Sequence, residues 1–320
     1  MTRVSLVIPC YNSSKTVGNV IDNIKKVMSE RYGYEYEIIL VNDCSADQTK
    51  DVIEDLCESD KNIKGLSLAK NFGQHAALMA GYAVATGELV VSMDDDGQTP
   101  ASEMFKLIDK LNEGYDVVYA SYEDKKHNSL RNFGSKLNTI MAELLIEKPK
   151  DLQVTSYFVA KRFVIDEILY YKNAYPYILG LVFRTTHNIA NVPVEHRERT
   201  EGKSNYNLKK LVSLWMNGFT AFSVKPLRIA TAIGLICAIL GFIFAIYTII
   251  HKLLNPNMVA GYSSMMSVQL FIGGLILMVL GLIGEYIGRI YISINNSPQY
   301  VIRETFNLEN EVNRAGINHE

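Results

Sequence analysis

The chain has 320 residues and a formal net charge of −2, so it lacks the basic balance that is typical of nucleic-acid-binding proteins. Its four cysteines show no Cys-x-x-Cys spacing, which predicts a reduced compartment without structural disulfides or a zinc site. The length allows one large domain and an additional segment, because a typical domain has about 150 residues.

The first 120 residues alternate between short apolar runs and segments with helical spacing. In chain order we expect a strand at 4–9, a helix at 16–29, a strand at 36–41, a helix at 46–57, a strand at 63–68, a helix at 73–85, a strand at 88–93, a helix at 101–111 and a strand at 117–120. This repetition predicts an α/β domain with a mostly parallel sheet, whose ligands bind at the carboxyl ends of the strands.

The pattern changes after residue 120. A helix is expected at 130–146, and residues 151–200 are less regular. Residues 205–224 carry an apolar stripe at helical spacing, with Lys209 and Lys210 outside it. A basic amphipathic helix just before a membrane span is typical of a helix lying on lipid headgroups. The alternative is an ordinary helix packed on the globular domain.

Two long segments contain no Asp, Glu, Lys or Arg, at residues 229–250 and 265–284. A bilayer core needs about 20 helical residues, so we expect transmembrane helices at about 229–250 and 265–287. A pair of buried core helices is the alternative. Lys and Arg gather before the first span and after the second, which predicts that the N-terminal domain and both termini face the cytoplasm. The run at 4–9 is too short for a signal peptide.

Three consecutive carboxylates, Asp94, Asp95 and Asp96, follow a predicted buried strand and precede Gly97 and Gln98. Neighbouring negative charges repel one another unless a cation is present. A Mg²⁺ ion that binds one or two carboxylates and the oxygens of a diphosphate would supply that cation. A solvated acidic turn that caps the next helix is the alternative.

Four motifs, in their order and spacing, resemble family-two glycosyltransferases. They are Pro9-Cys10-Tyr11-Asn12, the segment 42–49, the segment 71–77 and Asp94-Asp95-Asp96-Gly97-Gln98. Within that family, the chain is most similar to polyprenyl-phosphate glycosyltransferases, a group that includes dolichyl-phosphate mannose synthase and bacterial undecaprenyl-phosphate enzymes. The resemblance covers essentially the whole chain. It implies a GT-A fold, which is Rossmann-like, followed by the interfacial helix and the two transmembrane helices.

The resemblance also implies roles for individual residues. The implied nucleotide-sugar contacts are Pro9, Tyr11, Asn12, Asp43, Lys70, Asp94 and Asp95. The implied ligands of Mg²⁺ or Mn²⁺ are Asp96 and Gln98. The implied lipid-phosphate contacts are Arg131, Ser135, Arg199, Lys203 and Ser204. The catalytic candidates are Asp96, Arg131, Arg199 and Asp151.

The chain departs from the family pattern in four places. Ser13 follows Tyr-Asn where the family usually has Glu, and the family's Asp-Asp-x-Ser motif becomes Asn42-Asp43-Cys44-Ser45, with Asn42 in place of the first Asp. Tyr122 stands near a position where Arg is common. Gln153 occupies the place of a proposed catalytic Asp, which leaves Asp151 as the nearest acid. A phosphate monoester is mostly dianionic at neutral pH and needs no base, so this last change favours a phosphate acceptor.

Together, these features predict inverting transfer of a hexose or N-acetylhexosamine from a nucleotide-sugar, with UDP favoured over GDP, to undecaprenyl phosphate or a related polyprenyl phosphate. We expect the reaction at the cytoplasmic face of the plasma membrane, supplying lipid-linked sugar for cell-envelope glycans. The alternatives are a membrane-bound degenerate transferase or scaffold that only binds nucleotide, and a polysaccharide synthase. The Gln-x-x-Arg-Trp motif of the synthases is absent.

These expectations divide the chain into a catalytic domain at 1–204, an interfacial helix at 205–226, a transmembrane hairpin at 227–292 and a cytoplasmic tail at 293–320. The partners expected are the donor, the lipid acceptor and membrane lipid, with no nucleic acid. The resemblance implies a homo-tetramer.

Overall fold

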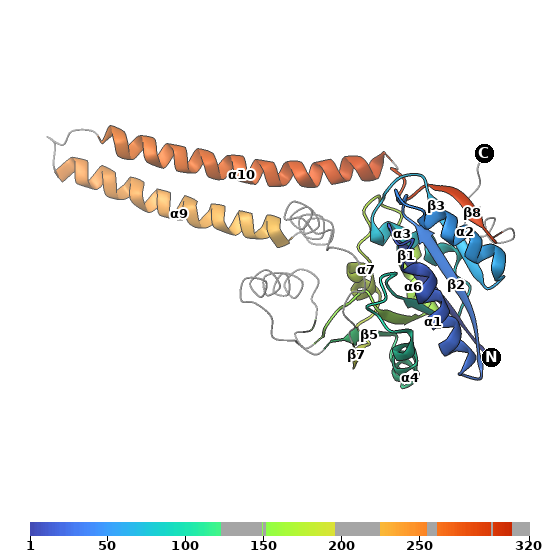
Figure 1. Cartoon of the computed structure of the whole chain (residues 1–320). Helices are drawn as coiled ribbons and strands as arrows, with labels where there is room; N and C mark the ends of the chain where they lie inside the picture. The colour runs from blue at the N-terminus through green and yellow to red at the C-terminus, as the bar shows by residue number, and fades with distance from the viewer. Residues whose placement is uncertain (123–148, 150–151, 196–224, 255–260, 296, 309–320) are drawn as a thin grey trace. The chain divides into compact units, whose positions relative to one another are not determined.

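The computed structural model describes residues 1–122, 149, 152–195, 225–254, 261–295 and 297–308. The helices expected at 130–146 and 205–224 lie outside these residues. The chain divides into two compact units, Met1–Lys210 with Asn296–Glu320 and Leu211–Asn295. The first unit contains a β-sheet with helices, and the second contains two long helices (Figure 1).

One sheet of eight strands organises the described part of the first unit, in the order β7-β5-β6-β4-β1-β2-β3-β8. The strands are β1 (Thr2–Cys10), β2 (Tyr34–Asn42), β3 (Ile63–Leu68), β4 (Leu89–Ser92), β5 (Val117–Ser121), β6 (Phe158–Lys161), β7 (Ile189–Pro193) and β8 (Ile302–Phe306). Strands β3, β2, β1 and β4 are parallel, as are β5 and β7, whereas β6 and β8 pair antiparallel with their neighbours. The expected α/β domain with a mostly parallel sheet is confirmed.

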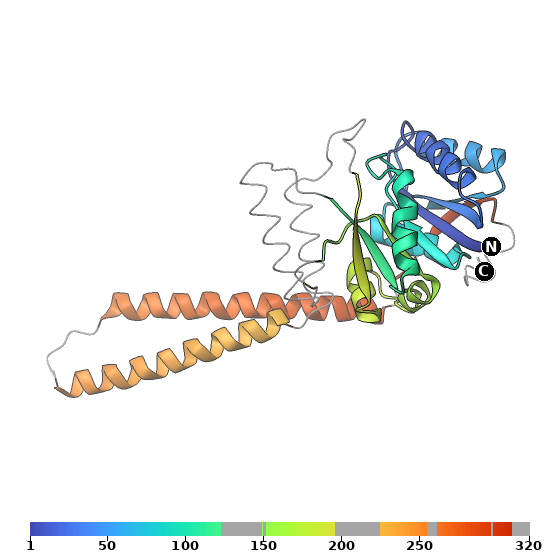
Figure 2. The same cartoon turned by 90° about the horizontal axis from the view of Figure 1, so that it is seen from below.

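Helices cover both faces of this sheet (Figure 2). They are α1 (Val17–Ser29), α2 (Thr49–Ser59), α3 (Gln74–Val84), the 3₁₀ turn η1 (Ala101–Glu103), α4 (Met104–Asn112), α6 (Arg162–Leu169) and α7 (Ile178–Thr185). Helix α1 buries Ile21 and Ile24 in the core that contains Leu6 of β1. Helix α3 packs on the opposite face, where Gly81 lies against Val7. Because both faces are covered, β1 is buried from Val4 to Cys10, as is typical of parallel strands.

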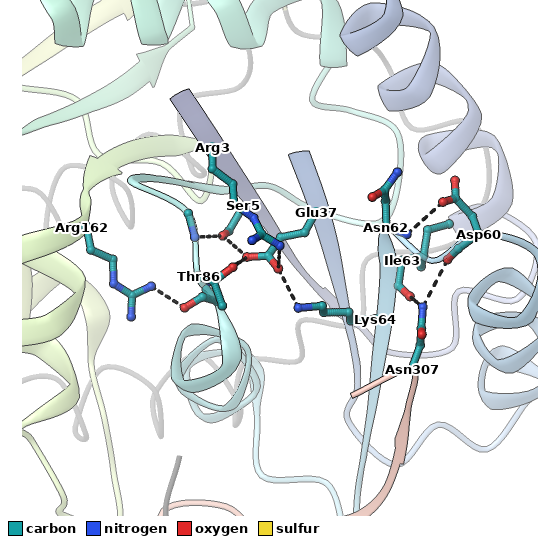
Figure 3. Close-up of polar contacts among 12 residues, drawn as sticks. Arg3, Ser5, Glu37, Asp60, Asn62, Ile63, Lys64, Thr86, Arg162 and Asn307 are labelled. Atoms are coloured by element: carbon teal, nitrogen blue, oxygen red, sulfur yellow. Dashed lines mark hydrogen bonds and ion pairs between the residues drawn. The ribbon is translucent and has the colours of Figure 1, made fainter. Parts of the chain in front are cut away.

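A buried charge cluster holds the amino-terminal half of the sheet together (Figure 3). The Glu37 carboxylate, 1% exposed, accepts hydrogen bonds from Ser5 Oγ at 2.5 Å, Lys64 Nζ at 2.8 Å and the Thr86 backbone N–H at 2.6 Å. Arg3 Nη2 lies 3.2 Å from the same carboxylate. These contacts join β1, β2 and β3 to the loop that enters β4.

The C-terminal segment differs from the polar tail expected from residue 293. Residues Ile302–Phe306 form β8, which pairs antiparallel with β3 although the two strands are far apart in sequence (Figure 1). Ile302 is buried, and the exposure of the strand alternates along its length. The side chain of Asn307 closes the pairing by donating to the Ile63 carbonyl at 2.8 Å. An alternating pattern over five residues predicts a strand only weakly. These residues form a strand because the edge of β3 offers unpaired backbone N–H and C=O groups.

The second unit contains α9 (Lys225–Leu254) and α10 (Tyr262–Ile294). Among the described residues, one helix is long and apolar enough to cross a membrane, over Phe271–Ile294. In the part of helix α9 that the structure describes, where the first span was expected, the strongly apolar stretch is shorter, over Ala230–Phe244, so two spans are not confirmed. None of the apolar window of α10 is buried, unlike the core helix of a soluble protein.

Candidate active site

The candidate site lies where the strand order reverses. Strands β2 and β3 extend the sheet on one side of β1, and β4 begins the other side. In an open α/β sheet this switch point leaves a crevice at the carboxyl ends of the strands. The loop after β1 begins at Tyr11, and the loop after β4 carries Asp94, Asp95 and Asp96. The two motifs therefore flank the crevice, at the edge of the sheet that the sequence predicted.

Hydrogen bonds between loops fix the turn after β1. Asn12 adopts a left-handed backbone conformation with φ of 56°. Its Oδ1 accepts from the Ala46 N–H at 2.9 Å, and its own N–H donates to Ser45 Oγ at 3.0 Å. The Ser13 N–H donates to Thr49 Oγ1 at 2.7 Å. Asn12 thus joins the loops after β1 and β2, so its side chain has a structural role at the site.

Asp43 holds the loop that leads into α3. Its two carboxylate oxygens accept the backbone N–H groups of Phe72 at 2.7 Å and Gly73 at 2.8 Å. Burial raises the pKa of Asp43, and these two hydrogen bonds oppose that shift. The Lys70 ammonium, near the same loop, lies 4.9 Å from the centroid of the Phe72 ring. Asp43 and Lys70, two expected nucleotide contacts, therefore meet at one short loop.

Asp94 is held by residues from two distant segments. Gln74 Nε2, at the start of α3, donates to Asp94 Oδ1 at 3.0 Å, and Ser156 Oγ donates to Asp94 Oδ2. Burial, and then the charges of Asp96 and Asp95, raise the pKa of Asp94 to about 6, although the Ser156 and Gln74 hydrogen bonds oppose the shift. A positive charge near this carboxyl group would stabilise its ionised form and lower its pKa.

Asp95 braces the loop after β1. Its Oδ2 accepts from the Tyr11 N–H at 3.1 Å and from Ser13 Oγ. Burial raises the pKa of Asp95, and these contacts partly offset it. A Glu at position 13, as in the family pattern, would place a second carboxylate beside Asp95. The serine found here instead donates a hydrogen bond to it.

Asp96 and Gln98 share one tight turn. The Gln98 N–H donates to Asp96 Oδ1 at 3.0 Å, and Gly97 between them has φ of 76°, which favours glycine. Within the described residues, no group of three His, Cys, Asp or Glu side chains could hold a metal ion. Mg²⁺ keeps several waters and takes one or two carboxylates plus phosphate oxygens, so this turn fits a cation that binds together with a diphosphate.

Tyr122 and Gln153 lie at the end of β5, beside the carboxylates. The Tyr122 N–H donates to Gln153 Oε1 at 3.1 Å, so the residue at the expected general-base position supports the backbone. Burial, and then the charges of Asp94 and Asp96, raise the pKa of Tyr122 to about 12. Its phenol therefore keeps its proton at neutral pH.

The structure brings together the expected residues Pro9, Tyr11, Asn12, Asp43, Lys70, Asp94, Asp95, Asp96 and Gln98 at one edge of the sheet. The remaining candidates lie outside the described residues: Arg131, Ser135, Asp151, Arg199, Lys203 and Ser204. Three supporting side chains were missed as site residues. They are Ser13, Gln74 and Ser156, and each is an ordinary polar residue until the fold places it against a carboxylate.

Comparison with known families gives two matches. Residues 5–169 match glycosyl transferase family 2. Residues 225–290 match the GtrB C-terminal hairpin, a region that contains most of α9 and α10.

Several curated relatives align over nearly the whole chain. An uncharacterised glycosyltransferase, YkcC of Bacillus subtilis, is 32% identical over 97% of this chain and 96% of its own. The bactoprenol glucosyl transferase of Shigella phage SfII is 33% identical over 95% of this chain and 98% of its own. The undecaprenyl-phosphate 4-deoxy-4-formamido-L-arabinose transferase of an Enterobacter species is 32% identical over 94% of this chain and 93% of its own.

Two solved structures share a fold with about two thirds of this chain. Mannosyl-3-phosphoglycerate synthase from Rubrobacter xylanophilus aligns with a TM-score of 0.50 and 20% identity, over 68% of this chain and 71% of its own. Glucosyl-3-phosphoglycerate synthase from Mycobacterium tuberculosis, in complex with Mn²⁺, uridine diphosphate and glucosyl-3-phosphoglycerate, gives a TM-score of 0.50 and 20% identity, over 67% of this chain and 76% of its own.

Proposed function

The chain belongs to glycosyl transferase family 2, and from that premise we propose that it transfers a sugar from a nucleoside diphosphate sugar to a polyprenyl phosphate. The observation that carries this proposal is the full-length likeness to enzymes named for bactoprenol and undecaprenyl phosphate, at 33% and 32% identity. Those relatives align through the hairpin as well as the sheet. A transferase with a water-soluble acceptor has no need of such a hairpin.

The donor would bind in the crevice at the switch point. Tyr11, 45% exposed, and the loop held by Asp43 would contact the nucleoside, and the turn of Asp96 and Gln98 would meet the diphosphate. The proposed donor is a UDP-sugar carrying a hexose or N-acetylhexosamine. The expected lipid-phosphate contacts Arg131, Ser135, Arg199, Lys203 and Ser204 remain part of this proposal. Guanidinium groups suit it because they hold phosphate through two hydrogen bonds.

A single displacement accounts for the chemistry that the site can support. The lipid phosphate dianion attacks the anomeric carbon, the bond to the nucleoside diphosphate breaks, and the configuration inverts. The nucleophile carries no proton to be removed, so the amide at Gln153 in place of a carboxylate is no obstacle. Asp151 is therefore not required as a base. The main work of the protein is to orient both substrates.

Asp96 and Gln98 would hold the cation, Mg²⁺ or Mn²⁺. When bound, it supplies charge stabilisation to the leaving diphosphate. The raised pKa values of Asp94 and Asp95 support this assignment, because both carboxyl groups are buried first of all and in addition lie near other carboxylates, so a cation would favour their ionised forms.

The membrane arrangement belongs to the same proposal. Helices α9 and α10 would form a hairpin of two spans, preceded by an interfacial helix at 205–226. The first unit and both termini would lie on the cytoplasmic side, next to an acceptor that stays in the bilayer. We also propose a homo-oligomer, with a tetramer as the expected state.

The decisive test is synthesis of a glycolipid. The full chain, purified in detergent, is incubated with undecaprenyl phosphate, Mg²⁺ or Mn²⁺ and a panel of UDP- and GDP-sugars, and products are separated by thin-layer chromatography. One donor should give a metal-dependent glycolipid. Asp96→Ala should lower kcat/KM by about 100-fold or more, since a cation at the diphosphate contributes several kcal/mol to the transition state. Asp109→Ala, which removes an exposed carboxylate paired with Arg31, is the matched control.

Nucleotide binding without product, for every donor tested, would contradict transfer to these acceptors. It would favour a degenerate transferase that only binds nucleotide.

A further inference from the structure

The loop between α6 and α7, residues 170–177, is unusually aromatic and partly exposed. We call it the aromatic loop. Tyr170 is 76% exposed and Tyr175 is 49% exposed, and the exposed Lys172 lies between them in sequence. A tyrosine ring is apolar with a polar tip, so tyrosine is enriched where hydrocarbon meets water at a membrane surface. Lysine suits the same layer because its stem is apolar and its ammonium stays in water.

Internal contacts hold the aromatic loop in one shape. Tyr171 Oη donates to the Tyr175 carbonyl at 3.3 Å. Gln299, 9% exposed, donates from Nε2 to the carbonyls of Tyr171 at 3.3 Å and Asn173 at 3.0 Å. The loop is therefore attached to the segment that precedes β8.

That segment follows directly on the candidate membrane span. The apolar window of α10 ends at Ile294, and Gln299 is five residues further along the chain. Five residues reach at most about 18 Å when fully extended. The headgroup layer on each side of a bilayer is about 5–8 Å thick. Covalent connection alone thus keeps the aromatic loop close to the surface at which α10 leaves the membrane.

The aromatic loop also lies at the same sheet edge as the candidate active site. The Tyr177 ring packs edge-on against His75, with centroids 5.3 Å apart, and the neighbouring Gln74 donates to Asp94. In the segment that contains Gln299, the Val301 carbonyl accepts a hydrogen bond at 2.8 Å from the N–H of Ala69, the residue just after β3. A surface that meets lipid here would turn the carboxyl edge of the sheet toward the bilayer.

The charges around the aromatic loop nearly cancel. Lys172 forms no ion pair within the described residues and lines a cavity of about 150 Å³ with Leu169, Gln299 and Tyr300. Glu167, on the last turn of α6, is exposed. Asp166 beside it is paired with Arg162 at 2.8 Å. Of these described residues, Lys172 adds one positive charge and Glu167 one negative charge, so binding to lipid would rest on the aromatic rings and would not require anionic lipid.

We propose that the aromatic loop docks on the lipid headgroups beside the span and so aligns the candidate active site with its membrane acceptor. This inference rests on the membrane location in the proposed function. It adds a contact surface formed by the sheet-containing unit itself, with Tyr170 and Tyr175 as its anchors.

Tryptophan fluorescence in lipid vesicles tests the contact. The single Trp215 is replaced by Phe, and reporters are introduced one at a time as Tyr170→Trp and Tyr175→Trp. The vesicles are phosphatidylcholine with a nitroxide on the headgroup. Tyr32→Trp is the matched control, because Tyr32 is 96% exposed and lies before β2, at the opposite end of the sheet. Leu277→Trp in α10, with deep nitroxides on the acyl chains, reports membrane insertion.

Both loop reporters should lose fluorescence with the headgroup nitroxide and shift to shorter wavelength relative to detergent solution, while the Tyr32→Trp reporter changes little. Added phosphatidylglycerol should leave the quenching unchanged. Absence of quenching at both loop reporters overturns the docking surface if Leu277→Trp is quenched, and the membrane assignment then stands. If Leu277→Trp is also unquenched, the proposed membrane location fails. Short-wavelength emission in detergent, unaffected by lipid nitroxides, would show that another copy of the chain covers the loop and would also overturn the proposal.

Discussion

Glu37 shows how a charge is kept inside the sheet. Burial alone would raise its pKa, but hydrogen bonds from Lys64, Ser5 and Thr86 and the charge of Lys64 lower it to about 2. Folding therefore favours the ionised form. This contribution to stability is fully present above the ordinary pKa of 4.5 and is lost as the pH falls toward about 2.

Replacing Glu37 by Gln should lower the free energy of unfolding by about 3–5 kcal/mol at neutral pH, because Lys64 loses its buried counter-charge. Thermal unfolding of the full chain in detergent measures the effect. The difference from the parent protein should be constant above pH 4.5 and should shrink below it. Glu35→Gln, an exposed position on the same strand, should change the free energy of unfolding by less than about 0.5 kcal/mol. An equal effect of both substitutions would contradict the role given to burial.

At the candidate site, some properties of the aspartates can be predicted from the sequence and others cannot. Asp94, Asp95 and Asp96 are visible as a run of like charges after an apolar strand. Their different surroundings are not, because Gln74 and Ser156 reach Asp94 from separate elements. A single serine or glutamine in the sequence does not indicate which carboxylate it will contact.

Among the elements, α3 depends on close approach to the sheet. A Cβ placed on Gly81 would overlap with Val7 Cγ1, and a β-branched side chain in a buried strand has little room to move. Gly81→Ala should therefore destabilise the protein by about 1–3 kcal/mol. Gly18 in α1 meets no atom within 4 Å, so Gly18→Ala should stabilise it by up to about 1 kcal/mol. Melting temperatures of the two variants test the opposite signs; a loss of stability in both would point to a general cost of alanine.

Strand β8 is a second element with a measurable role. A chain that ends at residue 300 lacks it, leaving the β3 edge unpaired and removing Ile302 from the core. The loss should exceed about 2 kcal/mol and promote aggregation, since burying one such side chain contributes about 1.5–3 kcal/mol. A chain that ends at residue 308 keeps the strand and should melt like the parent. Size-exclusion chromatography and thermal unfolding distinguish the two, and equal behaviour would mean that β8 adds nothing to stability.

At the scale of the whole molecule, the proposed function places a membrane span in α10. An arginine at Leu280, within the apolar window, should cost about 2.5–3.5 kcal/mol of insertion free energy. Ile294→Arg, at the end of the same window, should cost far less because the side chain can reach the headgroups. Alkaline extraction of membranes measures the fraction retained. Equal retention of Leu280→Arg and Ile294→Arg would argue against a span at this position.

The sequence by itself determined the α/β architecture, the family, the carboxylate turn at Asp96 and Gln98, and the apolar character of α10, because each is written in local patterns of apolar, charged and turn-forming residues. Only the tertiary structure decided that residues 302–306 complete the sheet beside β3, that Asn12 and Asp43 hold neighbouring loops, and that Gln299 attaches the aromatic loop to the segment after α10. These outcomes depend on contacts between residues far apart in the chain. Such contacts exist only once the folded chain has paid the entropy of bringing its segments together, and no local pattern records which partners meet.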